Sequence, residues 1–296
     1  FDQATGYVLL VIFIGVTSFL YFRTVITTEE ASLRPMFDLL PWILAVFIPA
    51  ATMRLVAEEQ RDGTLELLLT QPIRGWTVLL SKFCAGLAFV GVGIVATVGI
   101  PLSLQTAGNM DDGAVIAQYI GTFFLTSSFV AIGVFTSSLT RNQIVSFILA
   151  LSVITSLMVA GLPFITIALP SSAAVLVQDL SPLTHFSGIV RGVLDLRDIL
   201  YFVAVVSTFI SGTYLMLRSK SISHRSPLYR NLQLGVGGLV IISLLVGWFG
   251  RDIEGRIDLT ENNLYTLSKA TGELIDSLDD IVTVKLFASK APPVQI

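Results

Sequence analysis

Long apolar stretches recur along the chain and are separated by short polar segments. A helix that crosses the hydrocarbon core of a bilayer needs about 20 predominantly apolar residues. Seven stretches come close to this requirement: residues 7–26, 39–56, 76–104, 116–139, 144–169, 199–217 and 234–249. The pattern therefore predicts an all-α polytopic membrane protein.

The composition agrees with a membrane location. Hydrophobic residues make up 53% of the chain and charged residues only 13%, whereas a soluble domain has about 25% charged residues. A formal net charge of −3 excludes a broadly basic nucleic-acid binder. With Cys84 as the single cysteine and only two histidines, we expect no disulfide and no metal centre.

Small residues and prolines occur in or near several of the apolar stretches. Stretches 86–93 and 121–128 are rich in Gly, Ala, Ser and Thr, and such faces let membrane helices approach closely. They fit contacts between two copies of the chain or packing within one bundle, and the glycines also fit a pore lining. Prolines are expected to mark kinks or helix ends: Pro41, Pro49, Pro101 and Pro163.

Basic residues indicate the orientation, because Lys and Arg in short loops favour the cytoplasm. About nine lie on one side, in or next to the connection 57–75, at 141 and in 218–230, and about four lie on the other. The start of the chain is therefore expected inside, and everything after residue 250 outside. The charges within spans, at Asp38, Arg54 and Lys82, lie near span ends, where side chains can snorkel.

The connection after the second span predicts a short amphipathic helix. Gly63 is expected to end the helix that leaves the membrane, Asp62 or Thr64 to cap the next helix, and Pro72 to end it. Three leucines fall on one face at helical spacing: Leu65, Leu68 and Leu69. From the residues alone, this helix either caps the bundle or docks a cytosolic partner.

The same connection resembles the signature of ABC-type exporter permeases of the type 2 membrane family. The matching positions are Glu58, Glu59, Arg61, Gly63, Thr64, Leu65, Glu66, Leu68 and Pro72. The resemblance implies that this segment is the coupling helix for an ATP-binding subunit. It also implies a six-helix exporter domain over residues 1–218, a homodimer of permeases, and two cytosolic ABC ATPases that carry ATP and Mg.

Two further stretches resemble the gliding-motility (GldF) permeases: residues 1–8, and 181–186 with 191–198. Ser181 as N-cap and Pro182 at the first position open an amphipathic outer helix before the sixth span. Its expected apolar stripe consists of Phe186, Ile189, Val190, Val193 and Leu194. Off the stripe we expect His185, in a structural role, and a pair between Arg191 and Asp195. Pro182, His185, Phe186, Arg191 and Asp195 are thus candidates for an outer gate helix.

The end of the chain suggests a fusion. After the permease we expect a basic cytoplasmic linker over 219–233, a seventh transmembrane helix over 234–250, and an acidic, soluble segment over 251–296. Ser268 is expected to cap a helix, and residues 281–287 alternate like a strand. Two short sequence motifs resemble the first extracytoplasmic residues of GldG-type proteins; they contain Asp258, Thr260, Tyr265 and Ser268. We expect residues upstream of Phe1, and a larger extracytoplasmic α/β domain of which only the start is present.

The motifs favour a transport subunit over an enzyme. The chain contains no Gly-x-x-x-x-Gly-Lys-Ser/Thr loop, so ATP hydrolysis is expected on a separate partner. A scaffold that transmits force to an extracytoplasmic partner is the alternative, and a membrane-embedded enzyme is a further one. We therefore expect the transmembrane subunit of an ATP-driven exporter or extractor in a bacterial inner membrane, with the transported substrate unassigned.

Overall fold

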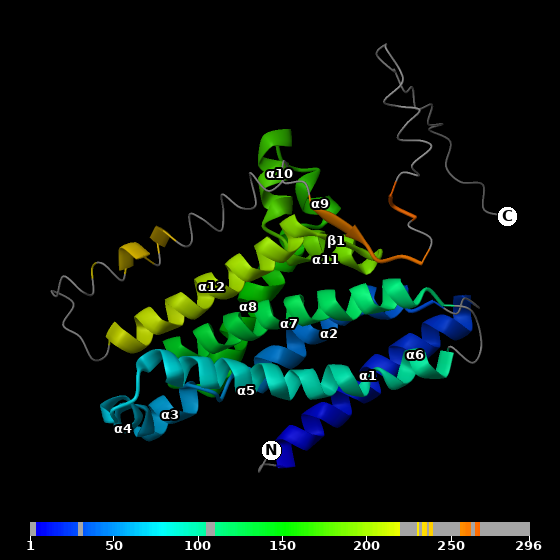
Figure 1. Ribbon diagram of the computed structural model, residues 1–296. Coiled ribbons are helices and arrows are strands. Elements are labelled where there is room, and N and C mark those ends of the chain that lie inside the picture. The colour runs from blue at the N-terminus through cyan, green and yellow to red at the C-terminus, as the bar shows by residue number, and fades with distance from the viewer. Residues whose placement is uncertain are drawn as a thin grey trace.

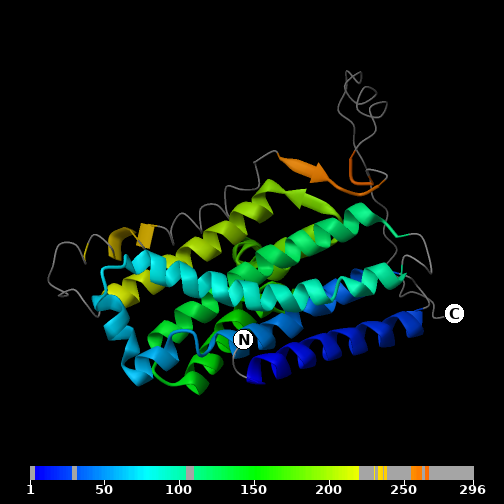
Figure 2. The ribbon, with the colours of Figure 1, turned by 60° about the horizontal axis from the view of Figure 1, so that its bottom comes forward.

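The structure is a computed structural model that describes residues 4–28, 32–104, 110–219, 230, 233–235, 237–238, 255–261 and 264–266. Its body is a bundle of long helices (Figures 1 and 2): α1 (Ala4–Thr28), α2 (Arg34–Thr52), α5 (Gly75–Ala96), α7 (Asp112–Leu139), α8 (Gln143–Ala160) and α12 (Leu196–Ser219). Within the described residues, 6 helical stretches are long and apolar enough to cross a membrane. The all-α polytopic fold and its first six spans are confirmed. The seventh span, the Ser268 helix and the strand over 281–287 lie almost wholly outside the described residues.

Helix α7 is the centre of the bundle. Of the 18 most apolar consecutive residues in α7, 67% are buried, whereas the corresponding share is 22% in α1 and in α8. Helix α2 crosses α7 so closely that a Cβ added to Gly133 would lie 2.1 Å from the Thr52 Oγ1 atom. Such proximity is what small residues make possible between membrane helices.

The predicted small-residue faces pack inside the bundle. A Cβ at Gly86 would lie 3.1 Å from a Leu55 methyl group, and one at Gly93 would lie 3.1 Å from the Phe13 ring. A Cβ at Gly121 would lie 2.7 Å from Ile189. These glycines therefore serve contacts within one chain.

Several helix ends follow from proline and glycine. Pro41 and Pro49 lie inside α2, which continues through both of them. The fifth span was predicted to run to residue 169 but its helix ends at Ala160, because Leu162 is extended (ψ 143°) before Pro163. Pro163 then opens the short helix α9 (Pro163–Thr166). The third span is likewise divided into α5 and α6 (Gly99–Leu104).

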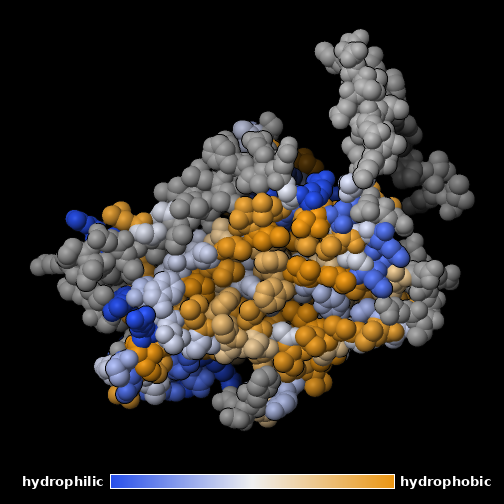
Figure 3. Space-filling model, viewed as in Figure 1, coloured by the Kyte–Doolittle hydropathy of each residue, from blue (hydrophilic) through white to orange (hydrophobic). Residues whose placement is uncertain are grey.

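The two ends of the bundle carry different elements. At one end, which we call the α4 end, lie α3 (Ala57–Asp62) and α4 (Thr64–Thr70). At the other, the sheet end, lie α9, α10 (Ser171–Asp179), α11 (Pro182–Val190) and two strands (Figure 1). Hydrophobic residues cover the middle of the face in Figure 3, and hydrophilic residues gather toward both ends. This distribution matches a bundle that crosses a bilayer.

The strands correct one prediction. The outer helix was expected to continue past residue 190, but α11 ends at Val190 and Gly192 turns the chain at φ +97°. Strand β1 (Val193–Asp195) follows and pairs antiparallel with β2 (Arg256–Asp258), in the register Val193 with Asp258, Leu194 with Ile257 and Asp195 with Arg256. Val193 and Leu194 are buried, as expected, but in a strand.

Candidate functional site

The segment over residues 57–74, from α3 to the start of α5, is called the α3–α4 loop and folds as a pair of short helices around one glycine. Gly63 ends α3 and precedes α4 with φ +74° and ψ 1°, which confirms the expected break. The predicted cap is wrong, because α4 has no side-chain cap. The Thr64 hydroxyl instead donates to the Glu59 carbonyl at 3.4 Å, and Asp62 pairs with Arg61 at 3.0 Å. Leu65 is buried and fixes α4 against the bundle.

Two serines at the end of α7 hold this loop. Ser137 Oγ accepts hydrogen bonds from the main-chain N–H groups of Val56 (3.1 Å) and Ala57 (3.0 Å). The amide Nε2 of buried Gln60 donates to the Ser138 carbonyl at 2.8 Å. Because the first N–H groups of a helix lack partners within the helix, Ser137 acts as an external cap for α3. The loop is therefore attached to the central helix of the bundle.

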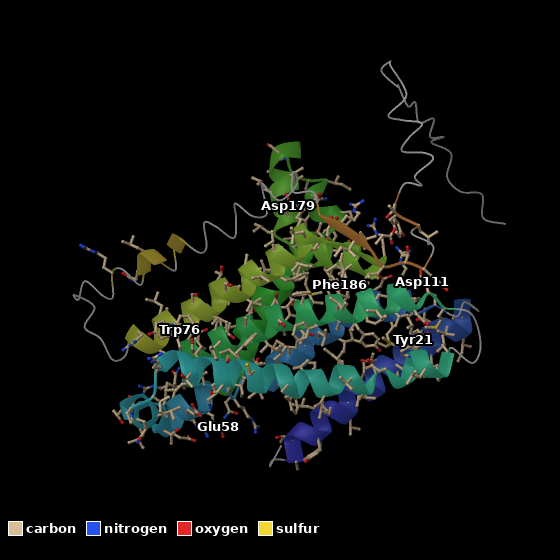
Figure 4. The ribbon with its side chains drawn as sticks, viewed as in Figure 1. Tyr21, Glu58, Trp76, Asp111, Asp179 and Phe186 are labelled. Carbon is tan, nitrogen blue, oxygen red and sulfur yellow. The ribbon has the colours of Figure 1, made fainter. Side chains whose placement is uncertain are left out.

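The two adjacent glutamates of the predicted coupling segment, Glu58 and Glu59, have different surroundings. Glu59 forms a salt bridge with Lys82 on α5, and its Oε2 atom is buried without a hydrogen-bond partner among the described residues. Glu58 on the neighbouring position is half-buried at the same end as Trp76 (Figure 4). Glu59 thus contributes to the bundle's own packing.

The surface of the loop is formed by residues that point away from the bundle. Of the predicted positions, Leu68 is half-buried, and the following are exposed: Arg61, Gly63, Thr64, Glu66 and Pro72. Two exposed apolar side chains were missed from the sequence, Leu67 with 67% of its surface accessible and Ile73 with 47%. The signal was available, because a residue two positions from buried Leu65 lies on roughly the opposite side of a helix.

The start of α5, just after this loop, is tied to the end of α12. The rings of Trp76 and Tyr214 stack with centroids 4.3 Å apart and an angle of 14°. Arg218 lies 5.7 Å from the centroid of the Tyr214 ring and donates from Nε to its hydroxyl at 3.1 Å. The loop is thereby connected through α5 to the last long helix.

The outer helix α11 is fixed to α12 by a buried polar cluster. Ser181 and Pro182 open α11 as predicted, with Ser181 accepting from the Leu183 N–H, and Phe186 is buried. His185 was expected off the apolar stripe but is buried: its Nδ1 lies 2.7 Å from Asp198 Oδ1 and its Nε2 lies 3.0 Å from the Asp179 carbonyl. Its ring also stacks on that of Tyr201 at 4.0 Å. These contacts give His185 a structural role.

The expected pair between Arg191 and Asp195 is wrong. Arg191 is exposed at the C-cap of α11, while Asp195 belongs to β1 and pairs with Arg256 (Nη2 to Oδ2, 3.0 Å). The helical spacing that would bring the two together is absent because the helix has already ended. Among the residues that the structure describes, no group of three or more His, Cys, Asp and Glu side chains is arranged to hold a metal ion.

Comparison with protein families identifies the chain. A family model described as "ABC-2 family transporter protein" matches residues 6–247, which include all of the long helices except the first two residues of α1, and also the α3–α4 loop and α11. Strand β2 lies beyond the matched residues. No curated protein and no solved structure matches the chain significantly.

Proposed function

The chain belongs to the ABC-2 family of transporter proteins, and we propose that it is the transmembrane subunit of an ATP-driven exporter or extractor. Membership in this family makes it a multi-pass membrane component of an ABC transporter. The finer assignment is ours: two copies of the chain pair with two cytosolic ATPases, which carry ATP and Mg, and move a substrate across or out of a bacterial inner membrane. The GldF-like subfamily and the fusion to a GldG-like segment belong to the same proposal.

The observation that carries this proposal is the construction of the α3–α4 loop. Ser137 and Ser138 attach it to α7, and the salt bridge between Glu59 and Lys82 attaches it to α5. The same loop exposes Leu67 and Ile73 away from the bundle. A firmly attached loop with two exposed apolar side chains is suited to receive a partner protein and to pass its movement into the helices.

The docking surface thus differs in detail from the sequence signature. Glu66, Leu67 and Ile73 are exposed and form its contact side. Glu59 supports the loop from behind, and Gly63 gives the loop its turn, since φ +74° is a conformation that glycine adopts at low cost. At the opposite end, α11 is proposed as the outer gate element, joined to α12 by the contact between His185 and Asp198.

Substitution of Leu67 tests the docking assignment. We expect Leu67→Glu to lower the ATP hydrolysis that co-purifies with the detergent-solubilised full chain at least about tenfold, because burying a leucine is worth about 1.5–3 kcal/mol and a buried unpaired carboxylate is unfavourable. The measurement is phosphate release, with the helical content of each variant checked by circular dichroism.

Leu176→Glu is the matched control, since Leu176 is also exposed (40%) but lies on α10 at the sheet end. It should leave the co-purified ATP hydrolysis unchanged. Equal losses in both variants would remove Leu67 from the docking surface. A wild-type chain that carries no ATP hydrolysis would favour the scaffold alternative, for which the docking of β2 on the sheet end is the supporting observation.

A further inference from the structure

A corner at the sheet end holds a distant part of the chain. We define the outer corner as Asp111, Gly113, Gly192 and strand β1, which come from the start of α7 and from the segment between α11 and α12. Residues 255–261 lie on this corner, although Arg256 follows Asp195 by 61 positions and Glu261 follows Asp111 by 150. Asp111 marks the corner in Figure 4.

The corner is shaped to admit main chain. A Cβ added to Gly113 would lie 1.6 Å from the Leu259 carbonyl oxygen, and one added to Gly192 would lie 2.6 Å from a Thr260 methyl carbon. Both distances are far below a van der Waals contact, so no larger residue fits at either position while the segment is docked. The absence of side chains at these two places creates the site.

The contacts in the corner are directed at peptide groups. Beyond the β1–β2 pairing, the Leu196 N–H donates to the Gly255 carbonyl at 2.8 Å and the Leu259 N–H donates to the Gly192 carbonyl at 3.0 Å. The Asp111 carboxylate, which caps α7 through the Ala114 N–H (2.9 Å), also accepts from the Glu261 N–H at 3.2 Å. Recognition of this kind depends on an extended backbone more than on sequence.

The ion pair between Arg256 and Asp195 is weak by comparison. Arg256 and Asp195 are 57% and 31% exposed, and exposed pairs of this kind contribute about 0–1 kcal/mol. The docked segment is instead prearranged by its own turn. Asp258 accepts from the Thr260 hydroxyl (2.6 Å) and the Tyr265 N–H (2.9 Å), and Thr260 Oγ1 accepts from the Leu264 N–H (2.9 Å).

We propose that the outer corner is a strand-addition site, whose ligand is an extended segment followed by an Asp-x-Thr turn, and that it binds residues 255–261 without requiring their covalent connection to α12. In this protein the site fixes residues 255–261 to the start of α7 and of α12. A separate chain that presents the same extended segment is the kind of partner that fits it.

A cysteine pair in a cleavable full-length chain tests the proposal. In a Cys84→Ser background, Asp195→Cys and Arg256→Cys occupy directly opposed positions, where antiparallel Cα atoms are about 4.5–5.5 Å apart and a disulfide can form. A protease site is inserted between residues 219 and 230 and is cut before oxidation. We expect the two fragments to become disulfide-linked with a yield within about twofold of the uncut protein. A tenfold drop on cutting would overturn the proposal, because the connection alone would then hold the segment.

Three further variants test whether the cross-link reports the register and the close approach at Gly113. Val193→Cys with Arg256→Cys is displaced by two residues from the register and should cross-link at least about tenfold less, since cysteines whose Cα atoms are more than about 7 Å apart cannot be bridged. Gly113→Ala should reduce the in-register yield at least tenfold, whereas Gly99→Ala, which meets nothing within 4 Å, should not. Unchanged cross-linking in Gly113→Ala would also overturn the proposal.

The last variant avoids any change in the bundle. Leu259→Pro lies in the docked segment and removes the N–H that bonds to the Gly192 carbonyl. It should lower the in-register yield at least tenfold even if Gly113→Ala fails to fold. A yield equal to that of the unsubstituted segment would contradict main-chain recognition.

Discussion

At the scale of single residues, side-chain oxygens in this protein form hydrogen bonds with main-chain groups at places where a helix or strand begins or ends. Ser137 does so at the junction of α2 and α3, where its hydroxyl also donates to the Met53 carbonyl at 3.1 Å. Asp258 does so at the end of β2, where one carboxylate holds a turn of several residues together. Both side chains act on peptide groups that would otherwise lack partners in that conformation.

The turn at Asp258 predicts that the docked segment is destabilised only at acid pH. Hydrogen bonds, foremost from the Thr260 hydroxyl, lower the pKa of Asp258 below its ordinary value of 3.8. A lowered pKa means that the carboxylate stabilises the docked turn fully above pH 3.8 and that this stabilisation is lost as the pH falls through the depressed value. Hydrogen–deuterium exchange of the 255–266 region, corrected for the intrinsic rate, should therefore be constant from about pH 8 to 5 and accelerate only below about pH 4.

Asp258→Asn should reproduce that acceleration at neutral pH, because the amide keeps the shape and removes the charge. Glu261→Gln is the control, since only the main-chain N–H of Glu261 takes part in the docking hydrogen bonds. Exchange that quickens between pH 7 and 5 would assign the acid sensitivity to another group.

At the scale of elements, helices α2 and α7 approach each other closely at Gly133. Gly133 faces Thr52, whose hydroxyl bonds back to the Ile48 carbonyl at 2.8 Å and so stays in place. We expect Gly133→Ala to destabilise the bundle by about 1–3 kcal/mol through overpacking, measured as a lower midpoint of thermal unfolding in detergent.

The partner variant shows whether the contact is the cause. Thr52→Ala removes the Oγ1 atom, so the double variant should recover part of the lost stability, although the Thr52 Cβ would still be 2.9 Å away. Gly91→Ala meets nothing within 4 Å and should unfold like the wild type. A Gly133→Ala protein as stable as the wild type would show that the two helices can separate at no cost.

Elements also show what the sequence can predict. The six spans, the break at Gly63 and the cap at Ser181 rest on local patterns, and all three were confirmed. The end of α11 was missed because strand β1 exists only by pairing with β2, a contact between residues far apart in the chain. The inward role of Glu59 was missed for the same reason, since Lys82 comes from another helix.

At the scale of the whole molecule, α12 runs from one end of the bundle to the other, and Gly255 lies again at the end where α12 began. Helix α12 has 24 residues and spans about 36 Å at 1.5 Å per residue. It runs from the sheet end at Leu196 to the α4 end, where Tyr214 meets Trp76, and Gly255 is again bonded to Leu196. The loop proposed for the ATPase and the docked segment thus lie at opposite ends.

This arrangement predicts opposite accessibility for the two ends. In a Cys84→Ser background, Ile257→Cys (60% exposed in the wild type) should react with a membrane-impermeant thiol reagent in intact cells whose outer envelope admits it. Leu67→Cys, also exposed, should react only after the inner membrane is opened. Labelling of Leu67→Cys alone in intact cells would invert the proposed orientation, and labelling of both would contradict a bundle that spans the membrane.

The β1–β2 pairing also has a consequence for synthesis. Asp195 leaves the ribosome 61 residues before its partner Arg256, which at about 5–20 residues per second is a delay of about 3–12 seconds. Helix α12 is made in the first part of that interval, and from Ser219 onward all six long helices of the body exist while the edge of β1 still lacks its strand. The outer corner is therefore the last part of the transporter body to be completed, and a nascent chain arrested between Ser219 and Gly255 would carry all six spans with that corner still open.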